Sequence, residues 1–420
     1  MALIVQKYGG TSVGSAERIK AVARRIAATV DQGHRVVAVV SAMGDTTDEL
    51  IALARQITDE PSERELDLLL STGEIVSCTL MAMALRQLGR DAIALTGFQA
   101  GIRTNATFSK ALITHVEPER ILRELERGRI VIVAGFQGIT EDLDITTLGR
   151  GGSDTTAVAV AIGIKADRCE IYTDVDGVFT ADPRVVPEAR KLRSISPEEM
   201  LELAKLGARV MHPRAVELAG VYHMPLVVRS SFNDNPGTVI QDEDAIAMEN
   251  RKKVRGIAHD TDVARITIVG VPDRPGIAAA IFQPLGEAAI NVDVIVQNVS
   301  HHGVTDLSFT VSRNDLRKAL RTIEPIAREL GATEVTHDAD LAKVSIVGAG
   351  IQTAPGYAGR MFKTLAEQNI NIVSITTSEI RITCLIKEEE VERAVRALHA
   401  AFALEDENAP DLAPRTVSGS

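Results

Sequence analysis

The chain has 420 residues, 45% of them hydrophobic, and this length exceeds the size at which a single hydrophobic core usually stops growing, so two or three domains are expected. Its 57 acidic and 46 basic residues leave a formal net charge of −11. That charge disfavours a nucleic acid or an anionic membrane as the main partner and favours small metabolites.

Neither a membrane span nor a secretion signal is expected. The longest apolar runs, such as 36–40 and 130–134, are short against the roughly 20 residues that a membrane helix needs. The N-terminus enters a strand-like stretch without a basic region, a long apolar region or a cleavage site. The three cysteines lack paired or metal-ligand spacing, which predicts small core residues in a reducing, cytoplasmic setting.

From the start to about residue 240, β-branched runs alternate with helical patterns, which predicts a mainly parallel open sheet sandwiched by helices. The predicted elements are, in chain order, the helix 19–30, the strand 36–40, the strand 130–134, the helix 155–162 and the strand 170–173. Ser196 then opens another helix, with Pro197 in the first turn and Glu199 three residues after the cap.

An internal repeat follows an acidic and then basic stretch. Each copy is expected to contain a strand, a Pro-Gly loop, a helix through a Phe and a Leu, and a second strand, at 290–295 in the first copy and 370–375 in the second. The two copies keep one register, because Gly276 matches Gly356 and Asn291 matches Asn371 at the same offset. The predicted domains are 1–240, a linker at 241–263, the repeats 264–340 and 341–404, and a polar tail at 405–420 that we expect to be disordered.

Several polar loops follow predicted strands, and an open α/β sheet builds its ligand cleft at such strand ends. The first, Lys7-Tyr-Gly-Gly-Thr-Ser, combines a lysine with glycine amides that can hold phosphate oxygens, although a Gly-Gly turn there is also common in proteins without ligands. The second, at 146–156, places Arg150, Ser153 and Asp154 beside a double glycine, where a simple helix cap is the alternative. The third, at 172–184, is rich in acids, and such turns are often purely structural.

These loops, together with SAMGDTTDEL at 41–50, STGE at 71–74 and RVMHPRAVE at 209–217, occur in the order and spacing of the aspartate kinases, which the chain resembles over about residues 1–404. The resemblance implies an amino-acid kinase fold followed by two ferredoxin-like ACT domains. It also implies transfer of the γ-phosphoryl of ATP to the side-chain carboxylate of L-aspartate, the entry step to lysine, threonine, methionine and diaminopimelate. Mg²⁺ would be held mainly by ATP, with no metal site built by the protein alone.

The resemblance also assigns roles to individual residues. Lys7 and Asp154 are the expected catalytic residues, and the substrate aspartate would be bound by Ser41, Thr47, Glu74, Arg150 and Ser153. The nucleotide would be bound by Lys7, Tyr8, Gly9, Gly10, Thr173, Asp174, Phe179, Asp182, Arg184 and Arg209. His212 is expected to be a packed or capping histidine rather than a catalytic one.

The repeats are similar to paired ACT domains, which bind amino acids. The feedback inhibitors implied are lysine and threonine, alone or together, and the first repeat matches the inhibitor-binding positions at Asp273, Pro275, Gly276, Ile277, Asn291, Val292, Asp293 and Gln297. The second repeat has Val373 and Ser374 where the first has Asp293 and Val294, so its site is expected to differ or to be empty. Self-association through the ACT domains is implied, and Met248 suggests a shorter chain starting there within an α2β2 assembly.

Two alternatives remain open at this point. A sensor with an inactive kinase domain would not need Lys7, Arg150 and Asp154, all of which are present. A superfamily kinase for another acid, such as acetylglutamate or carbamate, would not be expected to carry the paired repeats.

Overall fold

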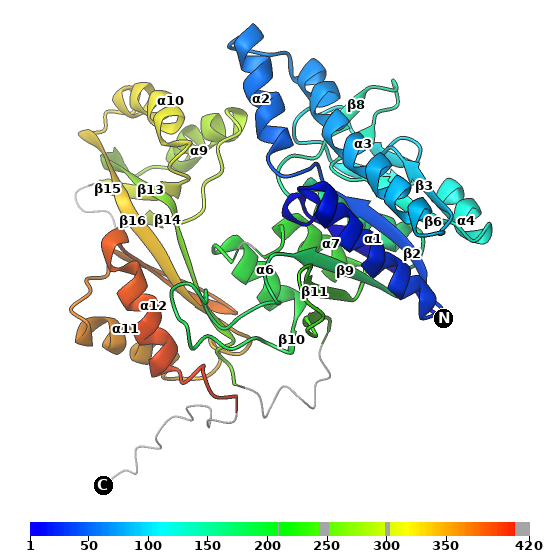
Figure 1. The fold of residues 1–420 in the computed structure, drawn as a ribbon. Coiled ribbons are helices and arrows are strands. Elements are labelled where there is room, and N and C mark those ends of the chain that lie inside the picture. The colour runs from blue at the N-terminus through cyan, green and yellow to red at the C-terminus, as the bar shows by residue number, and fades with distance from the viewer. Residues whose placement is uncertain (209, 243–251, 299–302, 408–420) are drawn as a thin grey trace. The chain divides into compact units, whose positions relative to one another are not determined.

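The computed structural model describes residues 1–208, 210–242, 252–298 and 303–407 (Figure 1). These residues form two compact units. The first comprises Met1–Phe179, Lys191–Lys205 and the described residues of 210–242, and the second comprises Thr180–Arg190, Leu206–Ala208 and the described residues of 252–407. Met248 and most of the predicted tail lie outside the described residues.

An eight-stranded sheet forms the centre of the first unit. Its strands lie in the order β10 (Ser194–Ile195), β12 (Thr238–Ile240), β11 (Leu226–Ser230), β9 (Arg168–Thr173), β1 (Leu3–Tyr8), β2 (Arg35–Val40), β6 (Ile130–Ala134) and β3 (Ala92–Leu95). Every pairing is parallel except that of β11 with β12. The mainly parallel sheet predicted from the sequence is therefore confirmed, and the carboxyl ends of β9, β1, β2 and β6 meet at one edge.

Helices cover both faces of this sheet. Helices α1 (Ala16–Asp31) and α3 (Glu63–Gln87) pack on one face, where Tyr8 enters their apolar core. Because side chains alternate along a strand, Lys7 points to the opposite face, which α5 (Gly152–Gly163) covers, with α7 (Pro213–Val221) packed against α5. The remaining elements of this unit are α2 (Thr46–Ile57), α4 (Glu119–Glu126), α6 (Pro197–Lys205) and a small sheet of β5 (Ile113–Val116), β4 (Ile102–Thr104), β7 (Gln137–Ile139) and β8 (Ile145–Thr147).

Local sequence signals place the helix starts. At α6, the Ser196 hydroxyl accepts a hydrogen bond from the Glu199 amide, and the Glu199 carboxylate accepts one from the Ser196 amide, which is the predicted capping box. The helix expected at 155–162 begins earlier, at Gly152, so the Gly-Ser-Asp of the second loop forms its first turn. The three cysteines are free and buried, as predicted.

Helix α3 is the one described helix that is long and apolar enough to cross a membrane by length and composition. Half of its apolar window is buried inside the protein. Asp67 and Glu74 also lie on it, both buried and hydrogen-bonded. These features are those of a core helix, and the expectation from short apolar runs overlooked it because its apolar residues are interrupted by polar ones.

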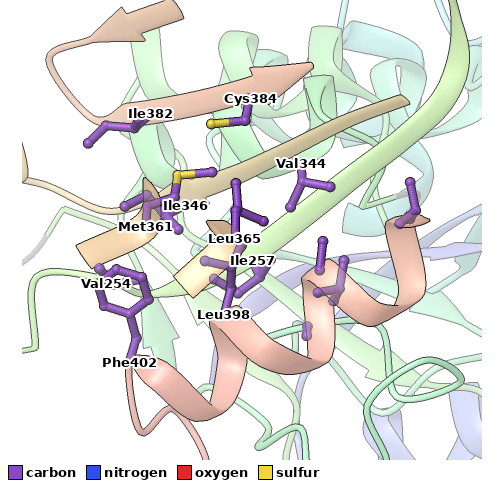
Figure 2. Packing of buried hydrophobic residues seen from close by; sticks show 14 of the residues in the cluster. Val254, Ile257, Val344, Ile346, Met361, Leu365, Ile382, Cys384, Leu398 and Phe402 are labelled. Carbon is purple, nitrogen blue, oxygen red and sulfur yellow. The ribbon is translucent and has the colours of Figure 1, made fainter. Parts of the chain in front are cut away.

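The second unit is built on one six-stranded sheet. Its strand order is β14 (Ile295–Gln297), β15 (Val304–Val311), β13 (Gly256–Pro272), β16 (Glu334–Val347), β18 (Arg381–Lys387) and β17 (Ser374–Ser378). Helices α9 (Ile277–Glu287) and α10 (Leu316–Glu329) belong to the first repeat, and α11 (Tyr357–Glu367) and α12 (Val391–Ala401) belong to the second. The repeats thus lie side by side within one chain, each with its own apolar core; Figure 2 shows that of the second repeat.

The boundaries of the repeats in the structure differ from those predicted from the sequence. Strand β13 begins at Gly256, inside the range expected to be a linker, because residues 256–260 pair with β16 and Ile257 enters the core of the second repeat. Residues 180–190, expected within the catalytic domain, add Val185 and Val186 to that same core. The second strand of each repeat also starts later than expected, since regular pairing begins only at Ile295 and at Ser374.

Candidate active site

Lys7 and Asp154 form an ion pair at the carboxyl edge of the first unit's sheet. The Lys7 Nζ lies 2.6 Å from Asp154 Oδ1, and both side chains are nearly buried, with exposed fractions of 12% and 10%. Strand β1 supplies the lysine, and the first turn of α5 supplies the aspartate. The backbone N–H of His212 donates to the other oxygen, Asp154 Oδ2, at 3.2 Å. The two predicted catalytic residues therefore meet, and the aspartate is oriented from two sides.

The glycines after β1 allow a close approach of two loops. A Cβ on Gly10 would lie 3.0 Å from the Ala42 carbonyl oxygen and 3.1 Å from that of Gly44. The Gly44 amide also donates to the Gly10 carbonyl. The Lys7 loop and the 41–47 loop thus form one surface, with the Gly9 and Gly10 backbone beside the lysine.

The loop before α5 is held in place by buried contacts. Gly151 has a positive φ, and a Cβ there would lie 2.3 Å from His212 Cδ2, so only glycine fits. Arg214 donates to the carbonyl oxygens of Leu148 and Ala111, both at 3.0 Å. Arg150 differs from these residues, because its side chain is 94% exposed and its nearest anionic partner is Asp48 at 3.9 Å. Its guanidinium is therefore open to a ligand.

Glu74 lies buried on α3, behind the 41–47 loop. Its Oε1 accepts the Ala42 amide at 3.0 Å, whereas Oε2 is buried without a hydrogen-bond partner. Burial raises the pKa of the Glu74 carboxyl to about 7, with the hydrogen bonds from backbone amides acting in the opposite direction. One turn later on the helix, the Ser77 hydroxyl donates to the Ser41 carbonyl at 2.6 Å, which ties Ser41 to the same helix. A buried carboxyl with one unpaired oxygen is suited to a cationic ligand group.

The turn after β9 carries Thr173 and Asp174, and the Thr173 hydroxyl donates to the Asp174 carboxylate at 3.1 Å. The Gly9 amide donates to the Tyr172 carbonyl, which places this turn beside the glycines of the β1 loop. Tyr8 stacks on Tyr172 with ring centroids 4.7 Å apart and has no exposed surface. Its ring is therefore inaccessible to a nucleotide. Of Tyr8, only the backbone atoms could make the predicted nucleotide contact.

The other expected nucleotide residues are divided between the two units. Phe179 is half-buried and pairs with Lys191 through an isolated bridge. Asp182 and Arg184 belong to the second unit, where the guanidinium donates to the carboxylate and holds the pKa of Asp182 below its usual range. Arg209 lies outside the described residues. Of the remaining aspartate-pocket residues, Thr47 is half-buried in the first turn of α2, and Ser153 is buried in the first turn of α5.

Two supporting residues were not singled out from the sequence. Asp67 has no exposed surface and accepts hydrogen bonds from the Ser109 amide and from both the amide and the hydroxyl of Thr147, so it anchors the start of the 146–156 loop. Arg214 anchors the same loop from α7. Arg214 stands within a quoted motif, whereas Asp67 lies four residues before the STGE segment and has no local signal. Within the described chain, no group of three or more His, Cys, Asp or Glu residues could hold a metal ion.

A cavity lies in the first repeat of the second unit. It has a volume of about 340 Å³ and includes five of the eight expected inhibitor-binding residues: Asp273, Pro275, Gly276, Ile277 and Gln297. Gly276 precedes α9, and the first residues of this helix line the cavity, so amides of the helix N-terminus can hold an anionic group. Asn291, Val292 and Asp293 do not line this cavity. Asp293 instead pairs with Lys343 of β16, with Nζ and Oδ2 2.5 Å apart.

Comparison with known proteins agrees with this arrangement. The model of the amino acid kinase family matches residues 2–230, and that of the ACT domain matches residues 266–325 and 344–402. An aspartate kinase of Stutzerimonas stutzeri is 52% identical over 405 residues, covering 96% of this chain and 98% of the relative. Aspartokinase 2 of Bacillus subtilis is 51% identical over 404 residues, with the same coverage.

The chain belongs to the aspartate kinases. Among solved structures, E. coli aspartokinase III in complex with aspartate and ADP matches with a TM-score of 0.79 at 26% identity, covering 96% of this chain and all of that one. The aspartate kinase of Synechocystis is 46% identical, with a TM-score of 0.54, and covers 96% of this chain and 70% of that one. The family resemblance and the fold class expected from the motifs are both confirmed, and the aspartate kinase family makes the chain an ATP-dependent kinase.

Proposed function

We propose that the chain transfers the γ-phosphoryl group of ATP to the side-chain carboxylate of L-aspartate, giving 4-phospho-L-aspartate for lysine, threonine and methionine synthesis. The observation that carries the proposal is the nearly buried Lys7–Asp154 pair beside the glycines of the β1 loop. The match to aspartokinase III in complex with aspartate and ADP supports it.

The chemistry requires positioning and charge neutralisation more than proton removal. An aspartate side chain has an ordinary pKa of about 3.9 and is already an anion near neutral pH, so it needs no strong general base. Lys7 would neutralise charge on the transferring phosphoryl group, and the Gly9 and Gly10 amides would hold its oxygens. Asp154 would keep the lysine in place until the phosphates arrive.

The substrate pocket would combine an exposed guanidinium with a buried carboxyl. Arg150 would form a bidentate contact with a carboxylate of aspartate, because the planar guanidinium matches the geometry of the two carboxylate oxygens. Glu74 would pair with the substrate ammonium through its unpaired oxygen. Ser41, Thr47 and Ser153 would complete the pocket.

Mg²⁺ would enter with ATP. In kinase sites this ion keeps several waters and takes phosphate oxygens with one or two carboxylates. Asp174, exposed beside the glycine loop, has the donor type that fits, so this residue would add the protein's contact to an ion held mainly by ATP. Bound there, Mg²⁺ would neutralise phosphate charge.

A coupled assay of ADP release, with aspartate, glutamate and acetylglutamate as acceptors, tests the proposal. Turnover with aspartate and little with the other two is expected. The absence of aspartate-dependent turnover would contradict the proposal. A preference for acetylglutamate would favour the alternative of a superfamily kinase that acts on that acid.

Replacing Arg150 by alanine should raise the KM for aspartate by about tenfold or more, since a lost charge-assisted contact is worth at least about 1.4 kcal/mol. The KM for ATP should change little. Thermal unfolding should also be unchanged, because the side chain is 94% exposed. An unaltered KM for aspartate would remove Arg150 from the substrate pocket.

For the second unit, we infer that lysine or threonine, alone or together, binds at the 340 Å³ cavity of the first repeat and inhibits the kinase. A structure of E. coli aspartokinase III in complex with lysine and aspartate, at 27% identity and a TM-score of 0.73, supports the lysine part. Asp273 would pair with the effector ammonium, and the first amides of α9 would hold its carboxylate.

Replacing Asp273 by asparagine should therefore weaken inhibition by the effector about tenfold while leaving uninhibited kcat unchanged. The measurement is an inhibition curve for each amino acid and for the two combined. Asp315, which lies before α10 and does not line the cavity, provides the matched control as Asp315→Asn. Equal inhibition of wild type and Asp273→Asn would place the effector elsewhere.

We further propose a cytoplasmic enzyme that associates through its ACT domains, with a second chain starting near Met248 in an α2β2 assembly. An intact-mass spectrum of protein expressed from the native gene tests the shorter chain. A single 45.1 kDa species would contradict it.

A further inference from the structure

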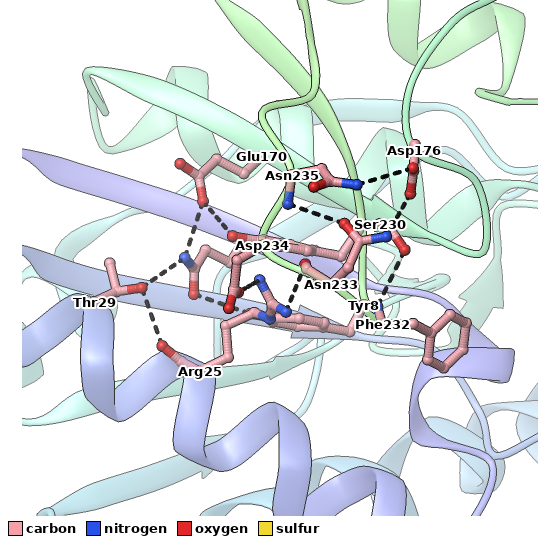
Figure 3. Close-up of polar contacts among 12 residues, drawn as sticks. Tyr8, Arg25, Thr29, Glu170, Asp176, Ser230, Phe232, Asn233, Asp234 and Asn235 are labelled. Atoms are coloured by element: carbon pink, nitrogen blue, oxygen red, sulfur yellow. Dashed lines mark hydrogen bonds and ion pairs between the residues drawn. The ribbon is translucent and has the colours of Figure 1, made fainter. Parts of the chain in front are cut away.

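The turn after β9 carries two aspartates in different surroundings. Asp174 is exposed and accepts a hydrogen bond from its neighbour Thr173. Asp176 is half-buried, and both of its oxygens are occupied: Oδ1 accepts the Asn233 side-chain amide at 2.6 Å, and Oδ2 accepts that of Asn235 at 3.2 Å. The Ser230 hydroxyl is a third partner (Figure 3).

These partners lie on a segment that is itself fixed. The backbone N–H of Asn235 donates to Asn233 Oδ1, which fixes the Asn233 side chain. Arg25 of α1 donates to the Asn233 carbonyl at 2.8 Å and pairs with Asp234 at 3.0 Å. The Arg25 guanidinium also lies 5.2 Å from the centre of the Tyr172 ring, on the strand that leads into the turn. The turn is thus clamped from the asparagines and from α1.

The turn has little freedom to relax on the other side. Gly177 has a φ of +146°, and a Cβ there would lie 2.6 Å from Thr238 Oγ1. The Thr238 hydroxyl in turn bonds the Val178 amide and the Leu192 carbonyl. A change at Asp176 must therefore be absorbed by the preceding residues, Thr173 and Asp174.

We propose that Asp176 is a positioning residue for the nucleotide: its carboxylate, held by the Asn233 and Asn235 amides, sets the conformation in which Thr173 and Asp174 meet ATP. Asp176 is thereby distinguished from a metal ligand. The proposal rests on the function proposed above. A carboxylate offers hydrogen-bond acceptors only, so both of its oxygens can accept the N–H groups of the asparagine side chains.

Asp176→Asn tests this role, because it places an amide where two amide N–H groups already point. An asparagine has one acceptor oxygen and one donor nitrogen, so one of the two contacts becomes donor against donor. We expect the KM for ATP and the dissociation constant for ADP, measured by titration calorimetry, to rise about tenfold. The KM for aspartate should stay within about twofold.

The double variant Asp176→Asn/Asn233→Asp provides the rescue. It exchanges the carboxylate and the amide, so the asparagine introduced at position 176 can donate to the aspartate introduced at position 233 and still accept from the Asn235 amide. Nucleotide affinity should return close to that of wild type. Asp142→Asn is the matched control, because Asp142 belongs to the same unit, is exposed, carries the same charge and makes none of the contacts that hold the turn. This variant should leave the KM for ATP unchanged.

Three outcomes overturn the proposal. The first is an unchanged ADP dissociation constant in Asp176→Asn. The second is an equal loss of affinity for both substrates together with a lower unfolding temperature, which would indicate a general role in folding. The third is a shifted Mg²⁺ activation curve that the double variant does not restore, which would make Asp176 a metal ligand. ADP calorimetry needs no turnover, so failure of the kinase assay with wild type is a separate result.

Discussion

Replacing Lys7 by methionine is expected to reduce kcat by about 10²-fold to 10³-fold, the usual loss when one preorganised charge or donor at the reacting group is removed. Methionine keeps the length of the side chain but leaves no cation for the phosphoryl group. It also leaves Asp154 nearly buried without its counter-ion, 2.6 Å away in the wild type. Breaking such a pair costs about 3 kcal/mol, so thermal unfolding should begin at a lower temperature.

The double variant Lys7→Met/Asp154→Asn separates these two effects. Removing both charges eliminates the unpaired carboxylate, so stability should recover most of its loss, while activity stays low because the cation is still absent. Steady-state kinetics and thermal unfolding of the same preparations provide the measurement. Wild-type kcat in the single variant would remove Lys7 from the catalytic machinery.

Replacing Glu74 by glutamine is expected to have opposite effects on stability and on binding. The glutamine side chain can still accept the Ala42 amide, but it cannot carry the charge that would pair with the substrate ammonium. The KM for aspartate should rise at least about tenfold at pH 8. At the same pH the variant should be more stable than wild type by up to about 3 kcal/mol, because the buried carboxylate is gone.

The pH dependence follows from the pKa of about 7. In the unfolded chain the Glu74 carboxyl loses its proton near its ordinary value, whereas in the folded chain it keeps the proton until about pH 7. Its contribution to stability is therefore fully present below about pH 4.5 and is lost as the pH rises through about 7. Unfolding of wild type and variant should coincide near pH 4 and diverge by pH 8. Parallel profiles would contradict the buried carboxyl.

In wild type, the KM for aspartate should fall as the pH rises through about 7, because only the ionised form of Glu74 attracts an ammonium group. The variant should lack this dependence. Lys343→Gln, which alters a charged residue of the second unit, serves as the control. Its KM for aspartate should show the same pH dependence as that of wild type.

Much of the fold could be predicted from the sequence because its signals are local. The apolar strand at 36–40, the helical spacing from Ile19 and the capping box at Ser196 each fix their own element. The proximity of Lys7 and Asp154 could be predicted as well, because strand ends and the helix starts that follow them lie at the same edge of a parallel sheet.

The rest depends on contacts between distant residues, which leave no local pattern. Asp176 looks like any acidic turn residue, and its partners Asn233 and Asn235 come more than 50 residues later. Tyr8 was expected at the nucleotide, but alternation along β1 turns its ring into the core shared with α1. Asp67 was missed because a buried carboxylate within an apolar helix has no signature until its amide partners are placed.

The contribution of residues 180–190 to the core of the second repeat has a consequence for how this protein can be divided. Val185 and Val186 are covered by side chains that follow the catalytic segment in the sequence, including Ile257 and Leu398. A fragment ending near residue 240 would expose these valines to water, and the regulatory fragment alone would have a gap in their place. An evolutionary exchange of the regulatory domains for others would therefore also have required substitutions in the loop 180–190, which lies within the kinase sequence.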